Sequence, residues 1–184
     1  MSNISSEQRA TPPRDAISLL RAALESLRPY QWLKNVLVFV PLAAAHRLGD
    51  PQLLARGAQA FIAFSLCASS VYLLNDLHDA SADRMHPHKN QRPIASGRLP
   101  PTLALALVPI LLAATLVASW PLGLKADAAL ASYLALMIAY TLRIKAIVLL
   151  DALVLAAGYA LRVLAGGLAV AIPVSYTHLT LPTN

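Results

Sequence analysis

The fold of this chain is decided by residues 58–84, which read AQAFIAFSLCASSVYLLNDLHDASADR. The first part, Ala58 to Leu74, is apolar and close to the roughly 20 residues that a helix needs to cross a bilayer. The second part places Asp76, Asp79 and Asp83 at i, i+3 and i+7, which is one face of a helix. Carboxylates at the end of a membrane helix are costly, and proteins usually retain them to bind a metal, a phosphate or a proton.

The residues around these acids favour binding of a phosphate together with magnesium. Three neighbouring carboxylates repel one another, whereas Mg²⁺ takes oxygen ligands and in turn holds phosphate oxygens. Asn75 adds a neutral oxygen beside the acids, and Arg84, Lys89 and Arg92 follow closely enough to bind the remaining phosphate charge. We therefore predict a site for magnesium and a diphosphate group. The alternative is a set of solvated charges that flank a membrane helix.

The composition is that of a membrane protein. Of the 184 residues, 57% are hydrophobic and 13% are charged, and the mean hydropathy is +0.57. Soluble domains carry about 25% charged residues. The net charge of +6 is unevenly distributed along the chain, which argues against a nucleic-acid-binding surface. Cys67 is the single cysteine, so neither a disulfide framework nor a cysteine metal site is expected.

The apolar segments predict an all-α fold, namely a polytopic bundle of transmembrane helices. Residues 1–14 are polar and are expected to form a disordered N-terminus without a signal peptide. Residues 15–174 are expected to form the transmembrane domain, which begins with an amphipathic helix that lies in the membrane interface or docks against the bundle. Five apolar segments follow this helix, at residues 36–45, 58–74, 103–122, 128–142 and 147–172.

Lysine and arginine are distributed unequally between the connections of these segments. They are frequent before the first segment, between the second and third, and between the fourth and fifth, and they are sparse in the other two connections. By the positive-inside rule, the N-terminus and the acidic motif are cytoplasmic. We therefore expect an integral protein of a bacterial plasma membrane whose acidic motif faces soluble phosphorylated metabolites.

Polar residues elsewhere are further candidates for phosphate binding. Lys34 and Asn35 precede the first apolar segment, and Arg143 ends the fourth on the same side, where the positive-inside pattern explains it equally well. Arg162 lies well inside the fifth segment, about 16 Å along the helix axis from Asp151, and we expect both to face a common polar cavity. A helix cap for Asp151 and a snorkelling side chain for Arg162 are the alternatives.

Several strings of residues resemble a known family. The pattern Asn75-Asp76-x-x-Asp79-x-x-x-Asp83 resembles the first aspartate-rich motif of the UbiA superfamily of intramembrane prenyltransferases. Three longer strings are similar to one branch of it, the decaprenyl-phosphate phosphoribosyltransferases. They are RPYQWLKN at 28–35, DRMHPHKNQRPIASG at 83–97 and LDALVLAAGYALRVLAG at 150–166. The resemblance covers about residues 28–174.

The resemblance implies an all-helical fold of about nine membrane helices, of which this chain contains about five. It implies Mg²⁺ as cofactor, held by Asn75, Asp76, Asp79 and Asp83, with Asp76 and Asp79 as the catalytic residues. In the branch, a polyprenyl phosphate attacks the anomeric carbon of phosphoribosyl pyrophosphate and releases diphosphate. Both molecules and the lipid bilayer are thus the expected partners. The residues expected to bind substrate phosphates are Lys34, Asn35, Arg84, Lys89, Arg92, Arg143 and Arg162.

The chain also departs from the superfamily. A second aspartate-rich motif, which the superfamily carries in its C-terminal half, does not occur in this sequence. We therefore expect the activity to belong to a longer parent protein and this chain alone to be inactive. Residues 175–184 have no helical pattern and are expected to be foreign to the protein. Two other functions stay open, a UbiA-type prenyltransferase that uses prenyl diphosphate with an aromatic or other acceptor, and a non-enzymatic membrane carrier.

Overall fold

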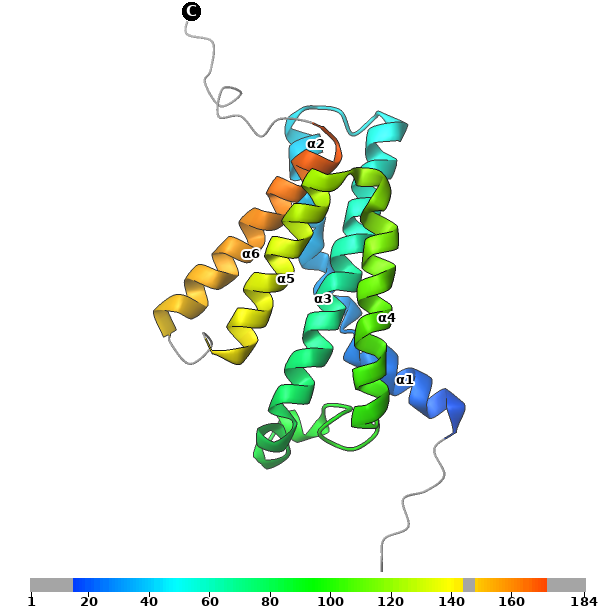
Figure 1. The fold of residues 1–184 in the computed structure, drawn as a ribbon, viewed down its shortest axis with the longest axis vertical. Coiled ribbons are helices and arrows are strands. Elements are labelled where there is room, and N and C mark those ends of the chain that lie inside the picture. The colour runs from blue at the N-terminus through cyan, green and yellow to red at the C-terminus, as the bar shows by residue number, and fades with distance from the viewer. Residues whose placement is uncertain (1–14, 144–147, 172–184) are drawn as a thin grey trace, which may run out of the picture.

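The computed structural model describes residues 15–143 and 148–171. Every element of this described part is helical, which confirms the predicted all-α fold (Figure 1). The predicted disordered N-terminus and the tail at 175–184 lie outside the described residues, as does the side chain of Asp151. In chain order the elements are α1 (Ala16–Ser26), η1 (Pro29–Phe39), α2 (Val40–Ala44), α3 (Pro51–Met85), η2 (Lys89–Gln91), α4 (Pro101–Ser119), η3 (Trp120–Leu122), α5 (Leu124–Leu142) and α6 (Val148–Ala169).

The helix α3 is the centre of the bundle. It packs against α4, α5, α6 and η1, and it carries both the apolar run and the acidic motif without interruption. Its first turn is fixed by Asp50, whose carboxylate accepts hydrogen bonds from the backbone N–H groups of Gln52 (3.1 Å) and Leu53 (3.2 Å). Pro51 at the first helical position costs nothing, because that N–H has no partner within a helix.

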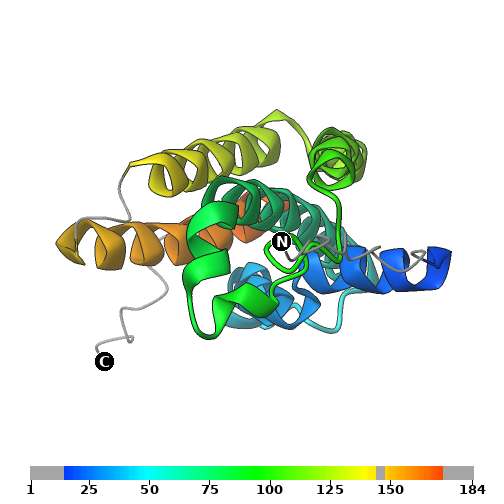
Figure 2. The same cartoon turned by 90° about the horizontal axis from the view of Figure 1, so that it is seen from below.

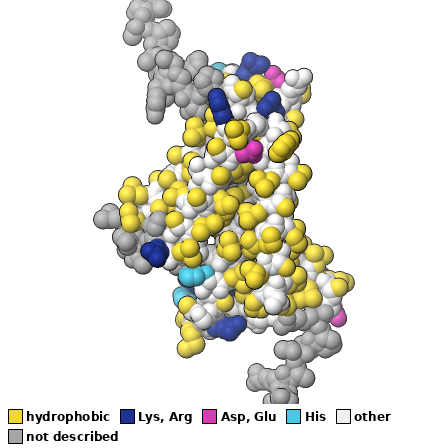
Figure 3. Space-filling view, viewed as in Figure 1, with side chains coloured by type: hydrophobic (Ala, Val, Ile, Leu, Met, Phe, Trp, Pro, Cys, Tyr) yellow, Lys and Arg dark blue, Asp and Glu magenta, His cyan; other side chains and the backbone are white. Residues whose placement is uncertain are grey.

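Three helices of the described part are long and apolar enough to cross a membrane. They are Pro51–Met85, Pro101–Leu122 and Ala152–Ala169, and they correspond to the second, third and fifth predicted segments. The fourth predicted segment lies within α5, which carries Lys125 and Asp127 near its start and does not reach the same hydropathy. Figure 3 shows hydrophobic side chains over the middle of one face and lysine and arginine mainly toward its ends.

The first predicted apolar segment, residues 36–45, is not a regular α-helix. It is divided between the 3₁₀ helix η1 and the short α2. A 3₁₀ helix rises about 2.0 Å per residue, against about 1.5 Å for an α-helix, so η1 and α2 together extend about 30 Å, which is the thickness of a bilayer core. A close tertiary contact accompanies the stretched form, because Gly166 on α6 lets the backbone at Val38 approach more closely than any side chain would allow.

The amphipathic helix expected at residues 15–27 is observed as α1. It docks by Ala22 and Ser26, which are each 1% exposed, and leaves Ile17, Leu20 and Leu24 exposed. Seen from below, α1 projects away from the bundle on one side and α6 on the other (Figure 2). The basic loop that follows α3, residues 86–100, lies at the same end of the molecule as α1 (Figure 1). The helix α2 and the turn between α4 and α5 lie at the other end.

Candidate functional site

A polar cavity of about 350 Å³ opens beside the acidic end of α3. Side chains from α3, η1, α5, α6 and the basic loop meet around it, although these elements are far apart in the sequence. Its charged lining is dominated by cations, with one carboxylate from Asp79. The polar side chains that line it are Arg28, Gln31, Lys34, Tyr72, Asn75, Asp79, Lys89, Arg92, Tyr133, Tyr140, Thr141, Tyr159 and Arg162.

The acidic motif divides into two pairs according to where its side chains point. Asn75 and Asp79 line the cavity. Asp76 and Asp83 are 2% and 3% exposed and are bound by arginines instead. Asn75 and Asp79 are spaced i, i+4, and Asp76 and Asp83 lie seven residues apart on the neighbouring stripe of α3. The helix therefore presents one pair to the cavity and the other to Arg28 and Arg92.

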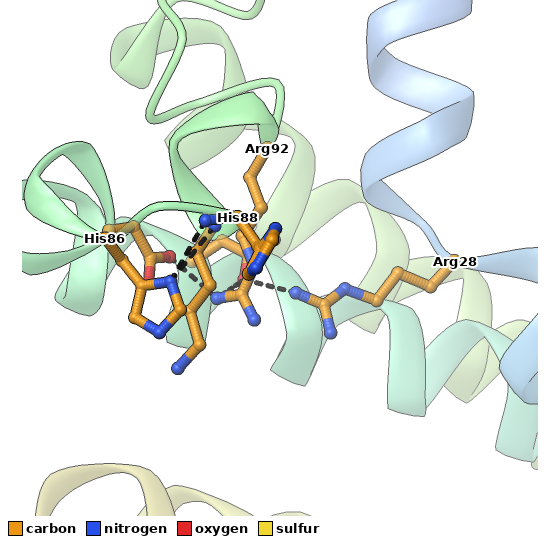
Figure 4. A network of polar contacts seen from close by, with 7 residues as sticks. Arg28, His86, His88 and Arg92 are labelled. Atoms are coloured by element: carbon orange, nitrogen blue, oxygen red, sulfur yellow. Dashed lines mark hydrogen bonds and ion pairs between the residues drawn. The ribbon is translucent and has the colours of Figure 1, made fainter.

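Two arginines neutralise the buried pair of aspartates, as Figure 4 shows. Arg28 Nη2 donates a hydrogen bond of 2.6 Å to Asp76 Oδ1. Arg92 Nη1 donates to Asp83 Oδ2 at 2.7 Å and to Asp76 Oδ1 at 3.2 Å. These bonds fasten both the start of η1 and the basic loop to the end of α3.

Sequence reasoning did not place Arg28 in the site. The residue has a left-handed backbone with φ of 52° between α1 and η1, and its guanidinium lies 5.2 Å from the centre of the Tyr72 ring. Burial by itself lowers the pKa of Arg28, but the hydrogen bond and charge of Asp76 outweigh burial and raise it. The signal available in the sequence was the pair Arg28-Pro29 directly before the first apolar segment.

The loop after α3 is anchored by buried apolar residues and by charge. Ile94 and Leu99 are both 0% exposed, while Gly97 turns the chain with φ of 77°. Arg98 reaches α1, where it forms two hydrogen bonds, of 2.6 and 2.9 Å, with the carboxylate of Glu25. The anchored loop holds Lys89 and Arg92 at the rim of the cavity.

Arg84, in the last turn of α3, and His86, directly after it, hold the loop in its conformation. Arg84 Nε donates to the carbonyl of Ala95 at 3.3 Å, and Arg84 does not line the cavity. His86, labelled beside His88 in Figure 4, accepts backbone hydrogen bonds from His88 (3.2 Å) and Lys89 (3.4 Å) through Nδ1. His86 thus organises the backbone that follows the end of α3.

Arg162 forms the deep end of the cavity. It is 5% exposed, so it does not snorkel. Its Nε donates to Asn35 Oδ1 at 2.7 Å, its Nη1 to the Gly158 carbonyl at 2.8 Å and its Nη2 to the Tyr133 hydroxyl at 2.9 Å. The ring centres of Tyr133 and Tyr159 lie 4.7 and 5.7 Å from the guanidinium carbon. Sequence reasoning missed these tyrosines, although Tyr159 lies only three residues before Arg162.

The other residues predicted to bind phosphate differ in where they lie relative to the cavity. Lys34 lines the cavity, and Asn35 is 1% exposed, with its amide nitrogen donating to Ser65 Oγ at 3.0 Å. Arg143 is exposed at the end of α5 and does not line the cavity. The positive-inside alternative fits this placement.

The donor set at the acidic end fits magnesium in part. Among the described residues, no three histidine, cysteine, aspartate or glutamate side chains are grouped as a metal site. Asn75 and Asp79 nevertheless present oxygen donors to the cavity, and Mg²⁺ is commonly held by one or two carboxylates together with substrate phosphates. The predicted set of four ligands stays a prediction, because Asp76 and Asp83 would have to leave their arginines to join it.

Comparison with known proteins identifies a family and several relatives. The profile of the UbiA prenyltransferase family matches residues 36–183. A decaprenyl-phosphate phosphoribosyltransferase of Mycolicibacterium smegmatis is 40% identical over 174 residues, which cover 92% of this chain and 54% of that protein. The protein of the same name from Corynebacterium glutamicum is 36% identical over 180 residues, covering 96% and 53%.

A third relative has a different name. Nodulation protein NoeC of Azorhizobium caulinodans is 40% identical over 155 residues, which cover 84% of this chain and 50% of that protein. The chain therefore spans about half the length of the curated relatives it matches. The family match and the three apolar helices together indicate an integral membrane protein. The chain belongs to the UbiA prenyltransferase family.

Proposed function

We propose that this chain is part of a magnesium-dependent membrane transferase, which moves the 5-phosphoribosyl group of phosphoribosyl pyrophosphate to a polyprenyl phosphate. The observation that carries the proposal is the cavity itself. It joins the oxygen donors Asn75 and Asp79 to the cationic side chains of Lys89 and Arg92 at the end of a membrane-length helix. The relatives named decaprenyl-phosphate phosphoribosyltransferase support the choice of substrates.

The residues of the cavity have separate roles in this proposal. Asn75 and Asp79, joined by Asp76 and Asp83 once these are released from their arginines, would hold Mg²⁺. When bound, the ion neutralises charge on the diphosphate leaving group. Lys89 and Arg92 bind the outer diphosphate oxygens. An oxygen of the lipid phosphate then forms a bond to the anomeric carbon while the bond from that carbon to diphosphate breaks, so diphosphate leaves with the bonding electrons.

Arg28 and Arg92 connect this chemistry to the conformation of the site. Each can exchange an aspartate for a phosphate oxygen, because both line the cavity while bonded to the motif acids. The proposal also places the acidic motif on the cytoplasmic side of a bacterial plasma membrane, where phosphoribosyl pyrophosphate is available. The clustering of α1 and the basic loop at one end of the bundle supports this orientation.

The test is a transfer assay in membranes that contain the full-length parent protein. Labelled phosphoribosyl pyrophosphate with decaprenyl phosphate is compared with a labelled prenyl diphosphate offered to an aromatic acceptor. We expect magnesium-dependent label only in the lipid phosphate product of the first pair, with loss of at least about 100-fold in Asp79→Ala, since the metal would lose a charged ligand. Transfer from prenyl diphosphate alone would establish the prenyltransferase alternative. Wild-type rates in Asp79→Ala would reject the assigned site.

A further inference from the structure

The cavity has a second cationic centre that the diphosphate site does not use. Arg162 binds Asn35 Oδ1, and the amide nitrogen of Asn35 binds Ser65 Oγ. Ser65 precedes Asp79 on α3 by about 21 Å of helix rise. Both residues line the same cavity but at different levels of α3, so the Arg162 guanidinium is placed to meet a different part of the bound substrates than the diphosphate at Asp79.

Within the described part of the chain, the partners of Arg162 are all neutral. They are an amide oxygen, a backbone carbonyl and a tyrosine hydroxyl, with two tyrosine rings beside the guanidinium. A guanidinium that is 5% exposed inside a membrane helix is costly when no anion compensates it. Its three hydrogen bonds fix its orientation but supply no negative charge.

The surroundings are built to hold this orientation. The guanidinium packs closely against α6 at Gly158, where a Cβ atom would lie 3.4 Å from Arg162 Nη1 and 3.3 Å from Met137 Cε. Tyr72 and Tyr159 add polar groups to the same wall. A fixed planar guanidinium with tyrosine hydroxyls around it is suited to the oxygens of a phosphate.

From these contacts we propose that Arg162 is the receptor for a phosphate monoester, bound in the deep part of the cavity and separate from the diphosphate at Asp79. The inference rests on the proposed function, in which two molecules supply such a group. One source is the phosphate of the polyprenyl acceptor, and the other is the 5-phosphate of the ribosyl donor. A prenyltransferase with an uncharged acceptor would need no such second anion site.

The experiment measures binding to the purified chain in lipid nanodiscs. The probes are farnesyl phosphate, ribose 5-phosphate and inorganic diphosphate with Mg²⁺, each titrated by calorimetry. In Arg162→Gln we expect one monoester to bind at least about 30-fold more weakly, as for loss of one partner of a buried charge pair, while diphosphate affinity changes less than about threefold. Weaker binding of farnesyl phosphate would identify the lipid phosphate as the ligand of Arg162. Weaker binding of ribose 5-phosphate would identify the 5-phosphate of the sugar.

A second variant distinguishes a loss of phosphate binding from a loss of folded structure. Asn35→Asp keeps the shape of the partner 2.7 Å from Arg162 Nε but places a carboxylate there, so it cancels the charge while retaining the arginine. We expect Asn35→Asp to weaken binding of the same monoester and to leave binding of diphosphate unchanged. The control is Arg47→Gln, because Arg47 pairs with Asp50 outside the cavity and should leave all three affinities unchanged.

The outcomes separate this inference from the proposed function. Wild-type affinity for both monoesters in Arg162→Gln and Asn35→Asp would overturn the inference, and so would a loss confined to diphosphate. Failure of the wild-type chain to bind either monoester would overturn it too. If the wild-type chain binds a monoester through Arg162 but neither diphosphate nor phosphoribosyl pyrophosphate, the deep site stands and the proposed transferase function fails.

Discussion

Replacing Asp76 by alanine should destabilise the folded chain, because the carboxylate joins two segments to the end of α3. The Asp76 side chain is 3% exposed and accepts hydrogen bonds from Arg28 at 2.6 Å and Arg92 at 3.2 Å. Removing one partner of a fully buried ion pair costs about 3–5 kcal/mol. The arginine side chains are 17% and 25% exposed and can recover some hydration, and Arg92 keeps its 2.7 Å contact with Asp83.

We therefore expect a cost somewhat below that range, about 2–3 kcal/mol, which corresponds to a fall in Tm of about 5–10 °C for a chain of this size. The assay is thermal unfolding of the purified protein in detergent with EDTA, so that bound divalent cations do not contribute. Arg47→Ala is the matched control, since its exposed pair with Asp50 is screened by solvent and should contribute little to stability.

A double-mutant cycle isolates the contact itself. Asp76→Ala, Arg28→Ala and the double variant should give a coupling energy of about 1–2 kcal/mol, because the two side chains contact each other directly. A Tm for Asp76→Ala within a degree of wild type, or a coupling energy near zero, would refute the view that Asp76 positions Arg28.

Two further predictions concern packing and pH. Gly166→Val should destabilise the chain by about 3 kcal/mol, because the new side chain would overlap the Val38 carbonyl, and Gly49→Val, in open space, should be neutral in the same unfolding assay. The hydrogen bond from Arg98 lowers the pKa of Glu25 below its usual 4.5, so the Glu25–Arg98 pair stabilises the fold above that value. Its contribution, below about 1 kcal/mol, should be lost as pH falls through the lowered pKa. Stability curves of wild type and Glu25→Gln should therefore converge at acid pH; a constant difference would contradict this.

The sequence predicted helices well where hydrophobicity persisted over a full membrane thickness. Residues 58–74 and 103–122 lie in α3 and in the helix Pro101–Leu122, because a long apolar run has few ways to satisfy its backbone in lipid other than as a helix. Residues 36–45 were expected to form a helix of the same kind, and the prediction was wrong in detail. Hydropathy carries no information on the close approach of Gly166 that accompanies the 3₁₀ form of η1.

The candidate site likewise combines features that the sequence predicted with features that it did not. The spacing of Asp76, Asp79 and Asp83 placed them on one helix end, because an α-helix has a fixed period. The spacing did not reveal that Asp79 faces the cavity while Asp76 and Asp83 bind arginines. That difference depends on where α1 and the basic loop pack, and such contacts between distant residues are absent from any local pattern.

By itself the sequence determined the composition class, the helical membrane segments and the acidic and basic residues available for phosphate chemistry. These properties follow from hydrophobicity and helical period, which act over short stretches of chain. Only the tertiary structure decided that Arg28 joins the site, that Arg162 turns inward to Asn35 and Tyr133, and that the motif divides into two pairs. Each of these depends on packing between helices distant in sequence, where burial fixes which charged groups must meet.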